Sequence, residues 1–211
     1  MFDDRADAGR RLAARLSHLP ARGVRVAVFG IARGGVLVAR AVADALGTDC
    51  DVIVARKLGA PWNPELALGA IASGVQVVDE ALLAETGVSA SELRRLIARE
   101  EREVARREER YRPGLPPRDL AGAIAVVVDD GIATGATAAA AIRWARARGA
   151  DRVVLAAPVA AALSLPRLRR EADEVVVLDA PSDFRAVGES YREFGQASDE
   201  DVLAALGRRA A

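Results

Sequence analysis

The sequence has few of the residues that build disulfides, histidine-based metal sites and catalytic triads. Its 211 residues contain one cysteine, Cys50, and one histidine, His18. A single cysteine cannot form an intramolecular disulfide, and its place at the start of an apolar run predicts a buried structural thiol. His18 lies near the end of an amphipathic segment, where a solvent-facing position is expected, so we predict neither a histidine metal cage nor a Ser/His/Asp triad.

Neither sign of charge is in excess, and long apolar runs are absent. Thirty acidic residues balance thirty basic ones, which argues against a nucleic acid or an anionic membrane as a partner. The first 15 residues carry charges of both signs rather than an apolar signal segment, and no later run is long enough to cross a bilayer. We therefore expect a soluble, cytoplasmic protein whose partner is a small molecule.

Hydrophobic residues make up 51% of the chain, which predicts one compact domain over residues 1–211. Short apolar runs typical of buried strands alternate with segments of helical spacing. The predicted strands are residues 24–29, 51–55, 123–128, 152–156 and 174–178, and the predicted helices are residues 5–19, 34–46, 89–111, 135–148 and 161–172. This alternation predicts an α/β fold with a mainly parallel sheet flanked by helices. We expect its core over about residues 20–180, and a small irregular C-terminal hood over about 181–197 together with the N-terminal segment.

The helix predicted over residues 89–111 opens with a capping box, Ser89 and Glu92, and is charged on nearly all sides. We interpret it as a solvated helix, with an RNA-binding stripe and a dimer contact as the alternatives. Residues 112–119 hold three prolines and a glycine and predict a connector that is neither helix nor central strand. Pro166 is expected to kink or delay the last predicted helix.

The residues best suited to chemistry follow the third predicted strand. Asp129 and Asp130 end this apolar strand, and small residues and hydroxyls then lead into a helix. The segment is expected at the carboxyl edge of a parallel sheet, where free amides at the helix start bind anions and Gly135 admits a phosphate close to the backbone. Thr134 and Thr137 add hydroxyl donors, and the two carboxylates suit the vicinal hydroxyls of a ribose or a magnesium ion.

The run over residues 126–137 resembles the signature with which type I phosphoribosyltransferases bind 5-phosphoribosyl-1-pyrophosphate (PRPP). Both acids, the Thr-Gly pair and the closing threonine match. The signature is specific to PRPP binding but less so to catalysis, since PRPP synthetases and some transcriptional regulators also carry it. The resemblance implies that Asp129 and Asp130 hold the ribose hydroxyls and bind Mg²⁺, directly or indirectly. It places the 5′-phosphate on Ala133, Thr134, Gly135, Ala136 and Thr137.

Two further segments follow the family's order. Residues 30–35 open a helix after the first predicted strand, so their amides and the Arg33 guanidinium can meet pyrophosphate oxygens. The family's pyrophosphate loop often holds a non-proline cis peptide, which here would be Ala32–Arg33. Lys57, the only lysine of the chain, precedes residues 58–66, which resemble the mobile lid that closes over the pyrophosphate and excludes water. The implied pyrophosphate ligands are Ala32, Arg33, Gly34, Gly35, Arg56 and Lys57.

The implied reaction transfers the 5-phosphoribosyl group from PRPP to a nitrogenous base and releases pyrophosphate, with Mg²⁺ as cofactor. The implied catalytic residues are Asp129, Asp130, Arg33, Lys57 and Glu65. Many purine-salvage members place an acid where this chain has Ala133, whereas adenine-type members carry alanine there. Glu65 on the lid is the substitute acid or base that we consider.

The acceptor base is expected to meet the hood, residues 181–196, through Asp183, Phe184 and Tyr191, although aromatic side chains in such a segment also serve packing. A homodimer is consistent with the family. The main alternative function is a PRPP-sensing regulatory or accessory module without turnover, which Ala133 favours and the retained Arg33 disfavours. A sugar-phosphate hydrolase is a third alternative, for which the chain shows no recognisable water-activating dyad.

Overall fold

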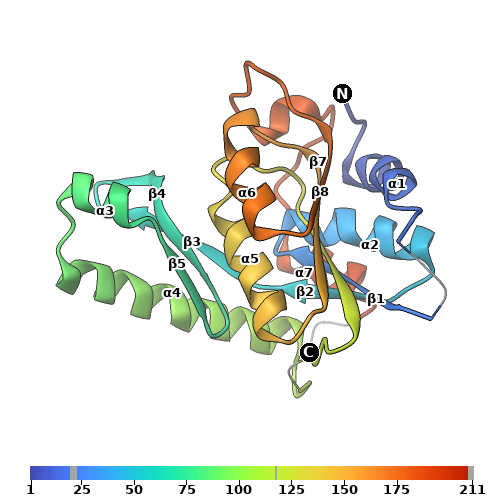
Figure 1. Ribbon diagram of the computed structural model, residues 1–211, viewed down its shortest axis with the longest axis horizontal. Helices are drawn as coiled ribbons and strands as arrows, with labels where there is room; N and C mark the ends of the chain where they lie inside the picture. The colour runs from blue at the N-terminus through green and yellow to red at the C-terminus, as the bar shows by residue number, and fades with distance from the viewer. Residues whose placement is uncertain (20–22, 117, 209–211) are drawn as a thin grey trace.

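The computed structural model describes residues 1–19, 23–116 and 118–208. Its centre is a five-stranded parallel sheet with the strand order β2-β1-β6-β7-β8 (Figure 1). The strands are β1 (Arg25–Ile31), β2 (Cys50–Ile53), β6 (Ala123–Val128), β7 (Arg152–Val159) and β8 (Glu174–Asp179). The chain adds β2 on one side of β1 and the later strands on the other. The loops after β1 and β6 therefore leave the same edge at the point where the strand order reverses, which is where such sheets bind ligands.

Helices cover both faces of this sheet because neighbouring residues of its strands are buried on opposite sides. Val126 packs with Leu12 and Val38, which belong to α1 (Arg5–Arg15) and α2 (Gly34–Leu46). Val127 packs in a separate cluster with Trp144 of α5 (Ala136–Ala147). The remaining helix on this second face is α6 (Leu165–Glu171), which follows the short 3₁₀ helix η1 (Ala162–Ser164).

A second, antiparallel sheet of three strands stands beside the first (Figure 1). It consists of β3 (Ala55–Ala60), β4 (Asn63–Ala72) and β5 (Val75–Val78). Ala70 and Val77 belong to the same apolar cluster as Trp144 of α5. Leu68 and Ile71 cluster instead with Leu96 and Val104 of α4 (Ala90–Tyr111). The small sheet therefore lies between α5 and α4, and α3 (Glu80–Thr86) connects β5 to α4.

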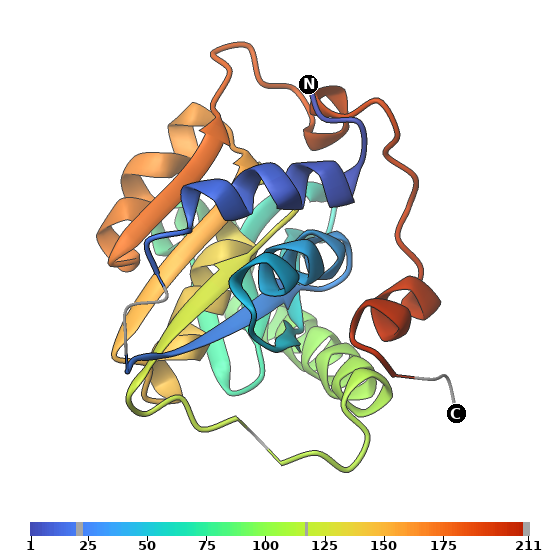
Figure 2. The same cartoon turned by 90° about the vertical axis from the view of Figure 1, so that its right-hand side faces the viewer.

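The N-terminal segment lies beside a late segment of the chain, before α7, near the start of α1 (Figure 2). The backbone of Phe2 donates to Ser190 (2.8 Å) and accepts from Arg192 (2.8 Å), so the N-terminal segment pairs with the predicted hood. The hood includes the 3₁₀ helix η2 (Val187–Ser190) and leads to α7 (Asp199–Ala205). Val202 and Leu203 of α7 are buried and cluster with Val36 of α2.

The five predicted strands of the parallel sheet are confirmed, as is the capping box of α4, in which Ser89 and Glu92 bond each other's backbone. Pro166 lies in the first turn of α6, so it delays the helix rather than kinking it. Cys50 is buried, and burial raises the pKa of its thiol to about 12, as expected for a structural thiol. Pro117, in the predicted connector, lies outside the described residues.

Residues 58–66, which the resemblance implied to be a mobile lid loop, contain strand residues at both ends. β3 continues to Ala60 and β4 begins at Asn63, so most of this segment forms a hairpin. A Cβ atom on Gly59 would lie 2.4 Å from the Pro64 carbonyl oxygen, which shows that the glycine permits close pairing here instead of ending the strand. The register shifts on either side of Gly59. We call this segment together with Lys57 of β3, residues 57–66, the lid hairpin.

Candidate functional site

The loop after β6 begins with the two predicted acids and is tied to the neighbouring strand β7. The Asp129 amide donates to the Ala156 carbonyl (3.1 Å), and the Ile132 amide donates to the Val159 carbonyl (2.9 Å). Gly135 has a φ of +76°, which glycine adopts without strain, and no side chain caps the helix that follows. The first turn of α5 therefore presents backbone amides to the loop, as a phosphate site requires.

A cavity of about 190 Å³ opens on this loop. Its lining consists of Lys57, Glu65, Gly131, Ile132, Ala133, Thr134, Gly135, Ala136 and Thr137. The structure thus brings two residues of the predicted lid to the predicted phosphate loop across more than 60 positions of the sequence. Within the lid hairpin, the Lys57 Nζ lies 3.0 Å from the Glu65 Oε2, and Glu65 is largely exposed.

The loop after β1 approaches the acids so closely that only glycine fits. A Cβ atom on Gly34 would lie 1.8 Å from the Asp130 Oδ2, and one on Gly35 would lie 2.7 Å from the Val128 carbonyl oxygen and 2.9 Å from the Asp129 Cα. The Ala32–Arg33 peptide bond is cis, as the resemblance implied. The predicted pyrophosphate loop and the predicted ribose-binding acids are therefore in direct contact.

The two acids differ in their surroundings. Burial, and next the charge of Asp130, raise the pKa of Asp129 well above its ordinary value. The Asp129 Oδ1 accepts a hydrogen bond from the Asp130 amide (2.9 Å). Asp130 instead forms an ion pair with Arg5 of α1, whose Nε lies 2.8 Å from its Oδ2. The pair therefore combines one carboxyl group that favours a proton with one that has a cationic partner.

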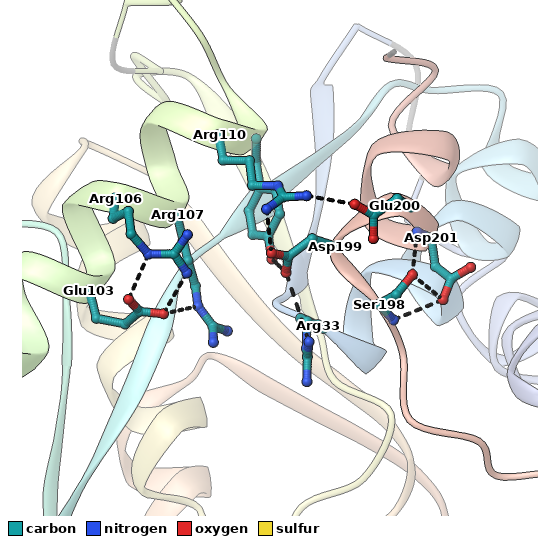
Figure 3. A network of polar contacts seen from close by, with 10 residues as sticks. Arg33, Glu103, Arg106, Arg107, Arg110, Ser198, Asp199, Glu200 and Asp201 are labelled. Atoms are coloured by element: carbon teal, nitrogen blue, oxygen red, sulfur yellow. Dashed lines mark hydrogen bonds and ion pairs between the residues drawn. The ribbon is translucent and has the colours of Figure 1, made fainter. Parts of the chain in front are cut away.

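Arg33 contacts α7 rather than the cavity (Figure 3). Its Nη1 lies 3.9 Å from Asp199, which also accepts a hydrogen bond from the Tyr111 hydroxyl (2.5 Å) and pairs with Arg110 (3.2 Å). The Tyr111 hydrogen bond is the main cause that lowers the pKa of Asp199. Asp199 therefore remains anionic at neutral pH and offers Arg33 a full negative charge.

Arg56 is likewise paired with a carboxylate of the protein itself. Both the Nη2 of Arg56 and that of Arg99 lie 2.8 Å from the buried Glu100 of α4. Arg56 also lines a larger groove of about 760 Å³ between the lid hairpin and α4, together with Lys57. Of the predicted pyrophosphate cations, only Lys57 lines the cavity at the phosphate loop.

The hood requires a correction. Tyr191 is only 5% exposed, its ring centroid lies 4.8 Å from that of Phe194, and its hydroxyl donates to the backbone carbonyl of Asp130 (2.6 Å). This burial leaves its ring no open face for a base, so Tyr191 supports the acid loop instead. Phe184 is half-buried against the same aromatic cluster, whereas Asp183 is exposed.

Three side chains that the sequence did not single out bind the predicted site residues: Arg5, Glu100 and Asp199. No motif marks them, because each lies far along the chain from the residue that it contacts. A spacing of 125 positions separates Arg5 from Asp130, for example.

A family model for the phosphoribosyl transferase domain matches residues 2–193. The chain belongs to this family. The phosphoribosyl transferase match ends before α7, so the helix that contacts Arg33 lies beyond the matched part.

Relatives agree with this assignment. Two Mycobacterium tuberculosis proteins, from strains CDC 1551 and H37Rv, are provisionally named as phosphoribosyl transferases, and each is 50% identical over 209 residues. The match covers 99% of this chain and 47% of each relative, so the chain spans about half the length of these curated relatives.

Solved structures extend the comparison. The crystal structure of TT1426 from Thermus thermophilus is 44% identical, has a TM-score of 0.80 and shares 97% of both chains. The AQ2163 protein from Aquifex aeolicus, at 14% identity and a TM-score of 0.54 over 87% of this chain and 78% of its own, shares the fold alone.

Membrane-spanning helices and clusters of metal-binding side chains are the last two features of this phosphoribosyl transferase domain. Among the described residues, no helix is both long and apolar enough to span a bilayer. The same residues contain no group of three or more His, Cys, Asp or Glu side chains placed to hold a metal ion.

Proposed function

We propose that this phosphoribosyl transferase domain transfers the 5-phosphoribosyl group from PRPP to a nitrogenous base and releases pyrophosphate, with Mg²⁺ as cofactor. The observation that carries the proposal is the contact between two loops. Gly34 and Gly35 touch the acids Asp129 and Asp130, and the free amides of α5 follow directly. A phosphate site, a diol site and a second anion site therefore adjoin one another, in the order in which PRPP carries these groups.

The proposed binding mode assigns each part of PRPP to one element. The 5′-phosphate would bind the start of α5, where Thr134 and Thr137 add hydroxyl donors beside the cavity. The ribose hydroxyls would donate to the carboxylate oxygens of Asp129 and Asp130. The pyrophosphate would meet the amides of residues 32–35 and the side chain of Lys57, which faces the same cavity from the lid hairpin.

The acids fit a magnesium ion that the substrate helps to hold. A magnesium ion in such sites commonly takes one or two carboxylates together with substrate phosphates and waters, and Asp129 and Asp130 supply two carboxyl groups at the sheet edge. When bound, the ion would neutralise charge on the departing pyrophosphate.

The chain's own residues would act mainly through electrostatics. As the C1–pyrophosphate bond breaks, negative charge grows on the leaving group, where Lys57 and the amides of residues 32–35 would stabilise it. Positive charge grows on the ribose ring, near Asp129 and Asp130. Closure of the lid hairpin would exclude water, and so favour transfer to the base over hydrolysis.

Proton transfer at the base has a candidate in Glu65. Its carboxylate lies 3.0 Å from Lys57 and is exposed beside the cavity, so it can reach a ligand without leaving the hairpin. Asp183 and Phe184 remain the proposed base contacts of the hood. The acceptor is a small molecule in this proposal, without nucleic acid or membrane as a partner, in a cytoplasmic and homodimeric protein.

A PRPP-sensing module without turnover is the second candidate. It is favoured by the carboxylate partners of Arg33 and Arg56, Asp199 and Glu100, which hold both cations away from the cavity. A sensor needs the phosphate and ribose contacts but no cations on a leaving group.

Calorimetric titration of PRPP with Mg²⁺ tests the proposal, with a double variant that combines Asp129→Asn and Asp130→Asn. We expect the wild type to bind and the double variant to lose binding while remaining folded. A screen for pyrophosphate release over nucleobases then separates the candidates. Base-dependent release identifies an enzyme, and binding without release identifies a sensor. A folded wild type that does not bind Mg²⁺ and PRPP contradicts both.

A further inference from the structure

Arg5, the first residue of α1, is fixed by three contacts outside its own helix. Its Nε donates to the Asp130 Oδ2 at 2.8 Å, its Nη1 donates to the Gly195 carbonyl at 2.8 Å, and its guanidinium lies 4.0 Å from the ring centre of Phe194. The side chain is 12% exposed. Such an arginine has lost much of its rotamer freedom, so its guanidinium is held at one place against the acid loop.

The contact takes one oxygen of Asp130 and leaves the other. Among the described residues, no group donates a hydrogen bond to the Asp130 Oδ1, and the Tyr191 hydroxyl binds the backbone carbonyl of Asp130 rather than its carboxylate. Gly34 has no side chain on the Oδ2 side, where a Cβ atom would lie 1.8 Å away. The carboxylate is therefore oriented by Arg5 within a space that the glycine keeps open.

The charges around Arg5 show why a cation is needed here. Asp129 adjoins Asp130, and two neighbouring carboxylates disfavour each other's ionised forms. The positive charge of Arg5 acts against the larger effects of burial and of the Asp130 charge, which raise the pKa of Asp129. On its outer side, Arg5 lines a cavity of about 470 Å³ whose charged members are Asp4, Arg40, Glu193 and Asp201.

We propose that Arg5 is a positioning residue for ribose binding: it fixes the rotamer of Asp130, with the Oδ1 left to accept a ligand hydroxyl. This inference rests on the proposed function. Arg5 itself touches no ligand in this role. It acts through Asp130 and makes the first turn of α1 part of the site, together with the end of the hood.

Arg5 also joins α1 to the hood, so a variant could lower activity only by loosening this contact. Two substitutions separate the roles. Arg5→Met keeps an unbranched side chain over Phe194 but removes the charge and the donors. Phe194→Leu removes the aromatic ring beneath the guanidinium and leaves the charge beside Asp130. A third variant, Arg5→Lys, restores a positive charge without the planar set of donors that reaches both Asp130 and Gly195.

The experiment measures the Kd of Mg²⁺ with PRPP by calorimetry, and stability by urea unfolding, with the full chain. We expect Arg5→Met to raise Kd about tenfold, a loss of about 1.4 kcal/mol. Arg5→Lys should recover part of this loss. Phe194→Leu should lower stability and change Kd less than Arg5→Met does.

A double-variant cycle decides whether Arg5 acts through Asp130. In an Asp130→Asn background, Arg5→Met should change Kd no further, because the partner that it positions is gone. An undiminished effect in that background overturns the proposal, as does an Arg5→Met variant that loses stability but keeps the wild-type Kd. Absence of binding in the folded wild type is a different result, since it removes the proposed function itself.

Discussion

At the scale of single residues, the glycines after β1 are as important for the geometry of the site as the charged side chains are. Gly34 and Gly35 have no room for a methyl group against the acid loop. The two differ in what a methyl group would meet: the Asp130 carboxylate at position 34, and the backbone at position 35. A carboxylate can turn away, whereas a strand backbone cannot move without disturbing the sheet.

Gly34→Ala should therefore damage binding more than folding. The added methyl group displaces the Asp130 carboxylate and breaks its ion pair with Arg5, so we expect Kd for Mg²⁺ with PRPP to rise at least about tenfold. Gly35→Ala should also lower stability, by about 1–3 kcal/mol, because the main chain of β6 must move. Urea unfolding and calorimetry measure the two effects. Gly195→Ala is the matched control, since a Cβ atom there meets nothing within 4 Å. A Gly34→Ala variant that binds like this control contradicts the proposed contact.

Glu65 offers a test of proton transfer. If its carboxylate exchanges a proton with the base, Glu65→Gln should lower turnover about a hundredfold and change Kd for PRPP little. Turnover is followed by pyrophosphate release at saturating PRPP. Glu65 is also the partner of Lys57, and loss of that partner alone would change Kd instead. Unchanged turnover would exclude the acid–base role.

At the scale of elements, the lid hairpin contains a tryptophan whose fluorescence can report its closure. The chain has two tryptophans; Trp62, in the hairpin turn, is 59% exposed, whereas Trp144 is 1% exposed in the core. If Mg²⁺ with PRPP closes the hairpin, Trp62 should become less accessible, its emission should shift to the blue, and acrylamide should quench it less. The change should vanish in Trp62→Phe, which leaves Trp144 in place. Ligand binding by calorimetry without any change in Trp62 emission would show that the hairpin stays open.

The helices and strands also show how much of the fold could be predicted from the sequence. The strands of the parallel sheet were predicted because their apolar runs are unbroken, and β6 is buried at every position. β4, β5, α3 and α7 were not predicted. β4 contains Pro64 and Gly69, and its exposed first residues lack an apolar run, while α3 and α7 have only seven residues each. Such elements are stabilised by tertiary packing, which a local pattern does not report.

The site divides in the same way. Asp129 to Thr137 are contiguous in sequence, so their chemistry could be predicted from one motif. The partners of Asp130 and Arg33, which are Arg5 and Asp199, could not, because only the folded chain brings them together. Tyr191 shows the reverse case: an aromatic residue in the expected place has its ring packed away. The type and position of a residue in the sequence suggest whether it can bind a base, but its burial in the fold decides whether its ring is accessible.

At the scale of the whole molecule, the charges proposed to bind PRPP already have internal counter-charges. Lys57 pairs with Glu65, Arg56 with Glu100, Arg33 with Asp199, and Asp130 with Arg5. These partners come from the lid hairpin, α4, α7 and α1. A ligand anion that binds Lys57, Arg33 or Arg56 must therefore compete with a carboxylate of the protein, whereas Arg5 occupies only one oxygen of Asp130. Binding is coupled to the packing of four separate elements. Asp129 stands apart, because burial and a neighbouring carboxylate disfavour its charge.

This difference predicts that Asp129 lowers stability at neutral pH. Its pKa is raised in the folded state, so the folded protein holds the proton more tightly than the unfolded chain. Stability contributed by the protonated form is complete below the unfolded pKa of about 3.9 and is lost as pH rises through the folded pKa. Asparagine cannot ionise, and its side-chain oxygen can still accept from the Asp130 amide. Asp129→Asn should therefore unfold at a higher urea concentration than the wild type at pH 7.

The gain should shrink as pH falls and vanish below the unfolded pKa of about 3.9, where the wild-type carboxyl is protonated in both states. Asp130→Asn is the matched control with the opposite sign, because it removes the ion pair with Arg5 and should lower stability at pH 7. Adding Mg²⁺ with PRPP should stabilise the wild type and not Asp129→Asn. An Asp129→Asn variant that is less stable than the wild type at pH 7 would show that the carboxylate is held by favourable contacts. We expect a binding site at the end of a buried strand to contain a residue whose charge serves function and lowers stability. Such a result would show that Asp129 is not a residue of this kind.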